Sequence, residues 1–181
     1  MAKTGYLCYA VFNTEPGWVA VLASDKGIKR LAVPQRTAER ALELLGPTIR
    51  DVKPHPNFLR DIIKLLRHYF QGREITFPEI CDLGEATSFQ RRVWEATRLI
   101  PYGETQSYRW VADQVGHKGA ARAVGQALSQ NPVPIIIPCH RVLGYNGSLC
   151  GFSCGLGWKR FLLELEAESA PVILDSNTPT L

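Results

Sequence analysis

The sequence predicts a small α/β domain followed by a mainly helical domain that carries a helix-turn-helix. Three observations lead to this. Segments rich in β-formers fill the first third, an amphipathic helical pattern follows them, and helical patterns broken by Gly and Pro occupy most of the rest. With 181 residues and 45% hydrophobic content, the chain can bury one ordinary core or two small ones. We place the domains at 1–84 and 85–170, with a tail at 171–181.

The first domain should consist of three strands and two helices. Residues 6–12, 18–22 and 28–33 are rich in β-formers, and the turn Ser24-Asp25-Lys26-Gly27 joins the last two strands into a hairpin. Residues 37–45 favour a helix that stops at Gly46-Pro47. Apolar residues then recur at 3.6-residue spacing over residues 58–70, so one amphipathic helix is expected to cover the sheet.

The second domain should begin with three helices. Thr87-Ser88-Phe89-Gln90 fits a capping box, which opens a helix that ends before Pro101-Tyr102-Gly103. Ser107 can cap a second helix over 108–115, and an Ala-rich helix over 120–129 follows after a Gly-bearing turn. Two short helices joined by such a turn are typical of a helix-turn-helix.

A reactive segment should follow these helices. Asn131-Pro132-Val133-Pro134 cannot continue a helix, so residues 135–137 are predicted to be a short buried strand or extended segment. This segment delivers Pro138-Cys139-His140-Arg141 to a fixed place. A Gly-rich loop over 144–157 and a final helix over 158–168 complete the domain.

Composition indicates that this protein is intracellular and that its partner is a nucleic acid. The chain has no run of eighteen apolar residues and no secretory leader pattern, so we expect no membrane partner and a cytoplasmic location. Five cysteines without framework spacing suit a reduced compartment. The net charge is +4, and residues 88–141 hold seven basic side chains against three acidic ones, which favours a polyanionic partner.

Cys139 is the candidate nucleophile. A thiol attacks as its thiolate and needs a base or a positive group beside it. His140 is adjacent, but an extended backbone would point it away, so proton transfer needs a bridging water or a turn. The imidazole should be oriented by a third group, for which the last helix offers three carboxylates and the spacing does not choose: Glu164, Glu166 and Glu168.

Two plainer interpretations compete with this one. Cys139 could be a small buried hydrophobe and His140 a core histidine with satisfied hydrogen bonds. Alternatively, Cys150 and Cys154 could join Cys139 in a zinc site, although the C-x-x-C pairs of strong zinc sites are absent. We therefore predict neither a metal nor any other cofactor.

The run Pro138-Cys139-His140-Arg141-Val142 resembles the active-site signature of the O6-alkylguanine-DNA alkyltransferases, also called methylated-DNA–protein-cysteine methyltransferases. The resemblance extends from about Ser88 to Glu166 through Ile100-Pro101-Tyr102-Gly103-Glu104, Ala120-Ala121-Arg122-Ala123-Val124-Gly125 and Asn131-Pro132-Val133-Pro134. It implies a ribonuclease-H-like first domain. It also implies DNA repair by direct reversal, in which an alkyl group passes irreversibly from O6-alkylguanine, and from O4-alkylthymine, to Cys139 once per molecule.

The resemblance implies roles for individual residues. Glu166 and His140 form a relay through a bridging water, the second helix of the helix-turn-helix enters the minor groove, and Arg122 fills the space of the flipped base. The implied catalytic residues are Cys139, His140, Glu166, Asn131 and Tyr108. The implied DNA contacts are Arg122, Ala121, Tyr108, Ser129, Gln126 and Arg141. The implied substrate pocket is lined by Val142, Phe152, Ser153, Cys154 and Lys159, with backbone carbonyls of Cys139 and Val142 accepting from the guanine amine.

The chain departs from the family pattern in its substrate loop. Phe152 lacks a hydroxyl that many relatives have, and Cys154 adds a side chain, so bulky alkyl groups should fit less well and a Cys139–Cys154 disulfide could form on oxidation. Ser24 and Lys29 stand where some relatives carry zinc ligands. The expected partner is double-stranded DNA containing O6-alkylguanine. The protein is expected to bind it as a monomer, with or without cooperativity, and to associate with the nucleoid or the nucleus. The rivals are a damage sensor that does not repair and a Cys-His hydrolase.

Overall fold

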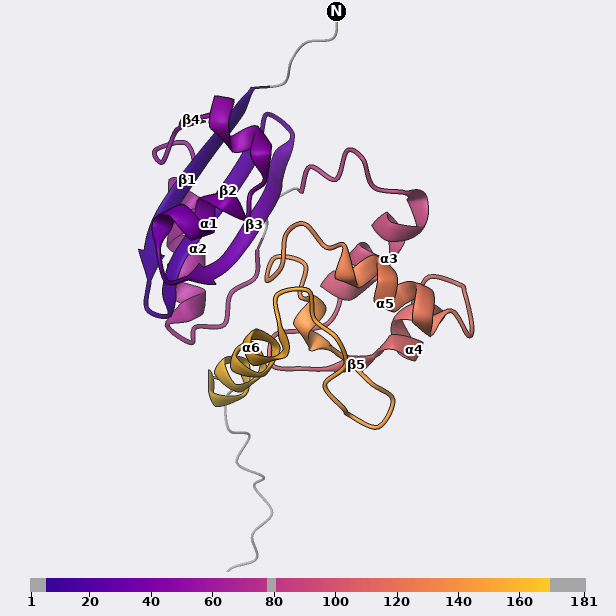
Figure 1. Cartoon of the computed structure of the whole chain (residues 1–181). Coiled ribbons are helices and arrows are strands. Elements are labelled where there is room, and N and C mark those ends of the chain that lie inside the picture. Colours follow the sequence, from indigo (N-terminus) through magenta and orange to yellow (C-terminus); the bar gives the residue numbers. More distant parts are fainter. Residues whose placement is uncertain (1–5, 78–80, 170–181) are drawn as a thin grey trace, which may run out of the picture.

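A computed structural model describes residues 6–77 and 81–169, so the predicted tail at 171–181 lies outside the described residues (Figure 1). The first part is a four-stranded sheet in the order β3-β2-β1-β4. Strands β1 (Leu7–Thr14), β2 (Gly17–Ser24) and β3 (Gly27–Gln35) form an antiparallel meander, and the short β4 (Lys53–Pro54) pairs parallel to β1. The predicted hairpin between the second and third strands is confirmed.

Helices cover both faces of this sheet, where the sequence predicted cover by one. Helix α2 (Arg60–Phe70) packs its apolar residues on one face. Helix α1 (Ala38–Glu43), which precedes the 3-10 turn η1 (Pro47–Asp51), buries Ala41 and the following Leu45 on the other. The reason is visible in β2, whose last six residues are all buried. A strand buried on both sides needs cover on both sides.

The second part is mainly helical. Helices α3 (Ser88–Arg98), α4 (Tyr108–Gln114) and α5 (Ala121–Ser129) pack on one another, and α6 (Leu156–Ser169) closes the described chain (Figure 1). Between them, β5 (Gln106–Ser107) and β6 (Val142–Leu143) form a short parallel pair. The predicted helices are therefore confirmed, with small shifts at their ends.

Side-chain caps hold the first turns of two of these helices. The Thr87 hydroxyl accepts from the Gln90 amide nitrogen at 3.2 Å, and the Gln90 side chain accepts from the Thr87 amide nitrogen at 2.9 Å. Ser107 accepts from the Trp110 amide nitrogen at 3.0 Å. Both predicted caps are confirmed, and they fix where α3 and α4 begin.

Loss of the first cap has a measurable cost. Thr87→Ala should lower the free energy of unfolding by about 1 kcal/mol, because the Gln90 amide in the first turn of α3 loses its side-chain acceptor. Thr105→Ala is the control, since Thr105 is exposed and lies outside any helix. Urea titrations of both variants measure the effect. Equal stability of the two variants would show that the cap does not hold α3.

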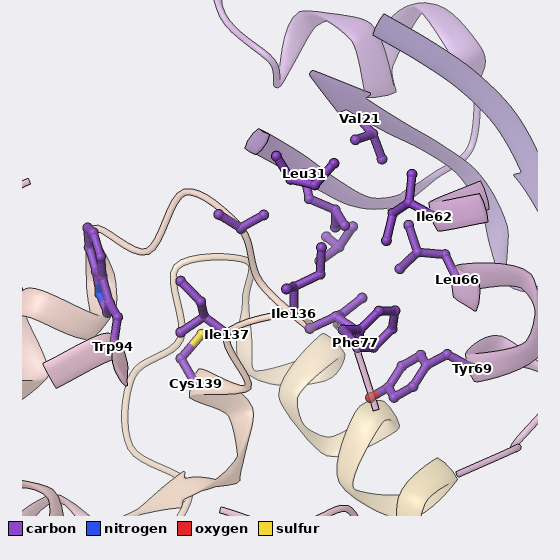
Figure 2. Close-up of a cluster of buried hydrophobic side chains, with 14 of the residues drawn as sticks. Val21, Leu31, Ile62, Leu66, Tyr69, Phe77, Trp94, Ile136, Ile137 and Cys139 are labelled. Carbon is purple, nitrogen blue, oxygen red and sulfur yellow. The ribbon is translucent and has the colours of Figure 1, made fainter. Parts of the chain in front are cut away.

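One apolar core runs through both parts of the molecule. Figure 2 shows Leu31 and Leu66 from the sheet part near Ile136 of the second part, and all three belong to one buried cluster. The backbone also joins the parts, because the Leu31 amide donates to the Pro132 carbonyl at 2.9 Å. The active-site segment therefore rests against the first part of the chain. The division of the chain near Gly84 stays a prediction.

A polar cluster lies where some relatives were expected to carry zinc. Ser24 donates its hydroxyl hydrogen to Asp82 at 2.7 Å, and the Lys29 ammonium lies 3.7 Å from the same carboxylate. Within residues 6–77 and 81–169, no group of His, Cys, Asp and Glu side chains could hold a metal. In the same ranges, no helix is long and apolar enough to cross a membrane.

Residues 135–137 are a buried turn, which corrects the prediction of a strand or extended segment. Ile135 has a φ of 77°, and the Ile137 amide donates to the Val133 carbonyl at 3.0 Å. Left-handed backbone at a β-branched residue costs roughly 1–3 kcal/mol and persists where the surroundings fix it. Here the Asn131 side chain fixes it, because it accepts from the Val133 amide at 3.0 Å and donates to the Ile137 carbonyl at 2.9 Å.

Candidate active site

Cys139 and His140 lie in the 3-10 turn η2 (Cys139–Arg141), which follows Pro138. The Cys139 amide donates to the Ile137 carbonyl at 2.8 Å, and the Arg141 amide donates to the Pro138 carbonyl at 2.9 Å. The adjacent Cys and His therefore do not alternate as they would in a strand. Both are buried: Cys139 is 4% exposed and His140 is 0% exposed.

Asn131 holds the thiol directly. Its amide nitrogen lies 3.1 Å from the Cys139 sulfur, and the same nitrogen donates to the Ile137 carbonyl. Asn131 thus links the turn after α5 to the reactive group. A donor aimed at sulfur favours the thiolate over the thiol.

The environment of Cys139 nevertheless keeps the thiol protonated at rest. Burial raises the pKa of the Cys139 thiol to about 12, against the opposing effects of the Asn131 hydrogen bond and the Lys159 ammonium. The nearby Cys154 thiol raises this pKa as well. A buried thiol of this kind reacts only when a base takes its proton. All the described cysteines, Cys139 and Cys154 included, are free.

His140 can be that base. Its Nε2 lies 2.8 Å from Oε1 of Glu166 on α6, so Glu166, among the three predicted carboxylates, is the one that contacts the imidazole. Burial lowers the pKa of His140, although Glu166 acts in the opposite direction. The imidazole is therefore neutral near pH 7. When the Nε2–H of His140 donates a hydrogen bond to Glu166, the Nδ1 atom carries a lone pair. This Nδ1 has no hydrogen-bond partner within the described part of the chain.

Glu166 is a buried carboxylate with several donors. Burial alone would raise its pKa, but hydrogen bonds from His140 and Arg141 and the charge of Arg141 lower the pKa of Glu166 to about 2. The Arg141 guanidinium donates from Nε to Oε2 at 2.8 Å and from Nη2 to Oε1 at 3.0 Å. The Gly103 amide, 3.2 Å from Oε2, adds another donor. The carboxylate is ionised and its orientation is fixed.

Arg141 was predicted to contact DNA, and the structure corrects this. Arg141 is 7% exposed, and its Nη1 donates to the Ile100 carbonyl at 2.7 Å. The physical reason is that Glu166 is a buried charge and needs an opposite charge beside it. Arg141 supplies that charge, so its role is internal.

Tyr69 is a site residue that the sequence analysis missed. Its position fits the apolar spacing expected for the helix over 58–70, yet its hydroxyl donates to Oε1 of Glu166 at 2.6 Å. A tyrosine on an apolar helix face must find a partner for its hydroxyl, which is a signal that the sequence offered. The sequence could not show that this partner lies 97 residues away.

One predicted pocket residue, Lys159, places a buried ammonium between β6 and the Gly-rich loop. Lys159 is fully buried, and its Nζ donates to the Val142 carbonyl at 2.7 Å and to the Cys150 carbonyl at 2.9 Å. Lys159 thereby ties the Gly-rich loop to β6. The Val142 carbonyl retains a second lone pair, as does the Cys139 carbonyl, which accepts from the Val142 amide.

The Gly-rich loop is otherwise open. Phe152 and Cys154 are half-buried, whereas Ser153 is exposed. Tyr108 of α4 lies beside this loop, with its hydroxyl 3.4 Å from the Gly151 carbonyl. Burial, together with the nearby Cys150 and Cys139, raises the pKa of Tyr108 to about 12, so it remains a proton donor. The loop thus lies beside Tyr108, and Ser153 in it is open to solvent.

The outer face of α5 carries the other predicted DNA contacts. Arg122, Gln126 and Ser129 are exposed, and Ala121 is half-buried. Positions 122, 126 and 129 share one helix face by their spacing. The Ser129 hydroxyl donates to the Gln126 carbonyl at 2.7 Å, which leaves its lone pairs available. The opposite face of α5 is buried through Val124, Ala127 and Leu128.

Comparison with known proteins places this site in a family. Residues 88–168 match the family model described as "6-O-methylguanine DNA methyltransferase, DNA binding domain". A methylated-DNA–protein-cysteine methyltransferase of Methanosarcina acetivorans is 37% identical over 158 residues, which cover 87% of this chain and 97% of the relative. The chain belongs to this family.

Other members of the methyltransferase family support the assignment. The Mycobacterium tuberculosis member is 50% identical over 121 residues, covering 67% of this chain and 73% of the relative. A crystal structure of the O6-methylguanine methyltransferase of that organism aligns with a TM-score of 0.78 at 38% identity, covering 92% and 96% of the two chains. A DNA complex of the M. tuberculosis protein aligns with a TM-score of 0.77 at 40% identity, covering 91% and 95%. This chain thus has the mixed α/β fold of these structures. It is a DNA-binding methyltransferase of DNA repair.

Proposed function

We propose that Cys139 is the alkyl acceptor and that each molecule acts once. The observation that supports this is the contact chain from the Cys139 turn through His140 to Glu166, in which a buried thiol is followed directly by a neutral imidazole held by an ionised carboxylate. The Cys139 sulfur forms a bond to the alkyl carbon while the bond from that carbon to O6 of guanine breaks. The resulting thioether has no leaving group that this site could activate, so transfer is irreversible.

His140 takes the thiol proton. Its Nδ1 has a free lone pair, and Glu166 stabilises the imidazolium that forms. A bridging water between the thiol and the imidazole is part of this proposal. The electron pair of the broken bond goes to the guanine, which leaves as a neutral base when it receives a proton. Tyr108, whose hydroxyl is protonated before the reaction, is the proposed donor. The proton that His140 takes from the thiol leaves the site in its place, so that Tyr108 is reprotonated and the step balances.

The proposed substrate is O6-alkylguanine in double-stranded DNA, with O4-alkylthymine as a second one. A methyl on O6 cannot reach a buried thiol while the base is stacked, so the nucleotide must flip out of the duplex. Helices α4 and α5 would act as a helix-turn-helix that presents Arg122 to the minor groove. The exposed face of α5 supports this placement. Phe152 and Cys154 narrow the loop, so methyl should transfer faster than bulkier groups.

Two further assignments belong to the same proposal. A meander of three strands with a fourth parallel strand, covered by helices on both faces, is compatible with a ribonuclease-H-like first domain. We propose that the protein binds DNA as a monomer. It would act in the cytoplasm or on the nucleoid.

Arg122→Ala should separate flipping from nonspecific binding. The variant should lose at least tenfold in transfer rate on duplex DNA, because nothing fills the space of the flipped base, while affinity for undamaged duplex falls much less. Arg40→Ala is the control, since Arg40 is an exposed arginine of α1 that pairs with Glu43. Stopped-flow transfer rates and fluorescence anisotropy measure the two effects. Equal losses in rate and affinity would assign Arg122 to plain phosphate binding.

The single-turnover proposal is tested by titration. Increasing amounts of O6-methylguanine duplex are added to a fixed amount of protein, and repaired guanine is counted after the reaction stops. The proposal predicts a plateau at one guanine per protein molecule. Continued repair beyond that ratio would contradict it, and binding without any repair would indicate a damage sensor.

A further inference from the structure

The first part of the chain contributes one side chain to the Glu166 site. Tyr69 on α2 is fully buried, and Figure 2 shows its hydroxyl directed away from the apolar cluster toward the last helix. That hydroxyl donates to Oε1 of Glu166 at 2.6 Å and lies 3.4 Å from Nε2 of His140. Tyr69 therefore touches both members of the proposed relay.

Oε1 of Glu166 is shared among three donors. It accepts hydrogen bonds from Nε2 of His140 at 2.8 Å, from the Tyr69 hydroxyl at 2.6 Å and from Nη2 of Arg141 at 3.0 Å. Each donor withdraws electron density from the same oxygen, so each weakens the hold of that oxygen on the other two hydrogens. The Tyr69 contact is the shortest of the three.

Other charged groups also act on the basicity of His140. Arg141 and Lys159 are cations and disfavour the imidazolium, whereas Glu166 favours it. Tyr102, whose ring lies 6.0 Å from that of Tyr69 between centroids, packs from the loop after α3. The pKa of Tyr69 is raised well above its usual value by burial and by Glu166, so it is a neutral donor at every working pH.

We propose that Tyr69 is a positioning residue for alkyl transfer, which fixes the Glu166 carboxylate and limits how strongly it holds the His140 proton. The inference rests on the proposed function, in which His140 accepts the thiol proton. The first part of the chain thereby contributes to the chemistry. Tyr69 on α2 adjusts the basicity of the His140 imidazole through the Glu166 carboxylate. A base that is too strong would already be protonated near pH 7 and could not accept the thiol proton.

The test is Tyr69→Phe, which keeps the ring and removes the hydroxyl. Without that donor, Oε1 holds the His140 proton more strongly and the imidazole becomes more basic. The acid limb of the pH profile of the single-turnover rate should move upward by about half a pH unit. The rate on the alkaline plateau should stay within about twofold, because a more basic imidazole is still a competent base.

Phe77→Leu is the matched control. The Phe77 ring lies 5.9 Å from the Tyr69 ring between centroids and is buried in the same cluster, but it carries no donor. This variant should lose stability and leave the acid limb where it is in the wild type. Thermal unfolding of both variants separates packing loss from the change at the relay.

A second readout does not depend on activity. In Tyr69→Phe the proton between His140 and Glu166 should move downfield in the NMR spectrum, because the remaining hydrogen bond is stronger. An unmoved acid limb together with an unmoved proton signal would overturn the role of Tyr69 while leaving the base assignment intact. If instead His140→Ala transfers at the wild-type rate, the proposed base itself is wrong, and the two failures are thereby distinguished.

Discussion

Cys139→Ala should show no detectable alkyl transfer and should bind duplex DNA as the wild type does. The alanine removes the sulfur that Asn131 and the η2 turn hold in place, and it adds no bulk to the buried site. DNA contact is proposed for the exposed face of α5, which this substitution does not touch. Transfer is followed by loss of label from O6-methylguanine duplex, and binding by anisotropy.

Two neighbouring thiols provide the controls for this variant. Cys154→Ser and Cys150→Ser keep the Gly-rich loop polar and leave Cys139 in place, so both should transfer at close to the wild-type rate. Cys154 raises the pKa of Cys139, and its removal should if anything make the nucleophile easier to ionise. Transfer by Cys139→Ala at a measurable rate would mean that another thiol accepts the group.

Glu166→Gln should damage both stability and transfer. The neutral amide leaves Arg141 as a buried cation without its anion, which typically costs 3–5 kcal/mol, so we expect a loss of about 4 kcal/mol in the free energy of unfolding. It also removes the charge that stabilises the imidazolium of His140, and transfer should fall by about 10²-fold or more. Glu164→Gln is the control, because Glu164 is exposed on the same helix.

The pH dependence of stability gives an independent check on Glu166. The pKa of Glu166 is lowered in the folded chain to about 2, from a value of 4.5 for a free glutamate. A lowered pKa contributes stability that is complete above the unfolded pKa and is lost as the pH falls through the folded pKa. Wild type should therefore lose this contribution between about pH 4.5 and pH 2. Glu166→Gln should lack that component, and a wild-type-like acid loss in this variant would contradict the account.

Local sequence signals predicted the elements well. The capping box at Thr87, the Ser107 cap and the turn at Ser24-Asp25-Lys26-Gly27 each depend on residues within four positions of one another, so a single sequence contains the needed information. The same holds for α2, whose apolar spacing reflects one packed face. The chemistry of Cys139 and His140 alone left the core interpretation open, and the wider motif pattern was needed to favour a nucleophile.

Local sequence signals could not predict contacts between residues far apart in the chain. Spacing could not choose among Glu164, Glu166 and Glu168, because each lies on the last helix and only the packing of α6 against η2 selects one. Arg141 seemed an exposed cation for the same reason: its partner comes from another element. The turn at Ile135 was missed because an isoleucine with positive φ contradicts local preference, and only the Asn131 contacts explain it.

The most direct measurement of the central claim is a peptide map of the protein after reaction with O6-methylguanine duplex. Mass spectrometry should find one added methyl group on the tryptic peptide that contains Cys139, in an amount equal to the guanine restored. Peptides with Cys150 and Cys154 should be unmodified. A methyl group on any other residue, or restored guanine with an unmodified protein, would contradict the assignment of Cys139 as the acceptor.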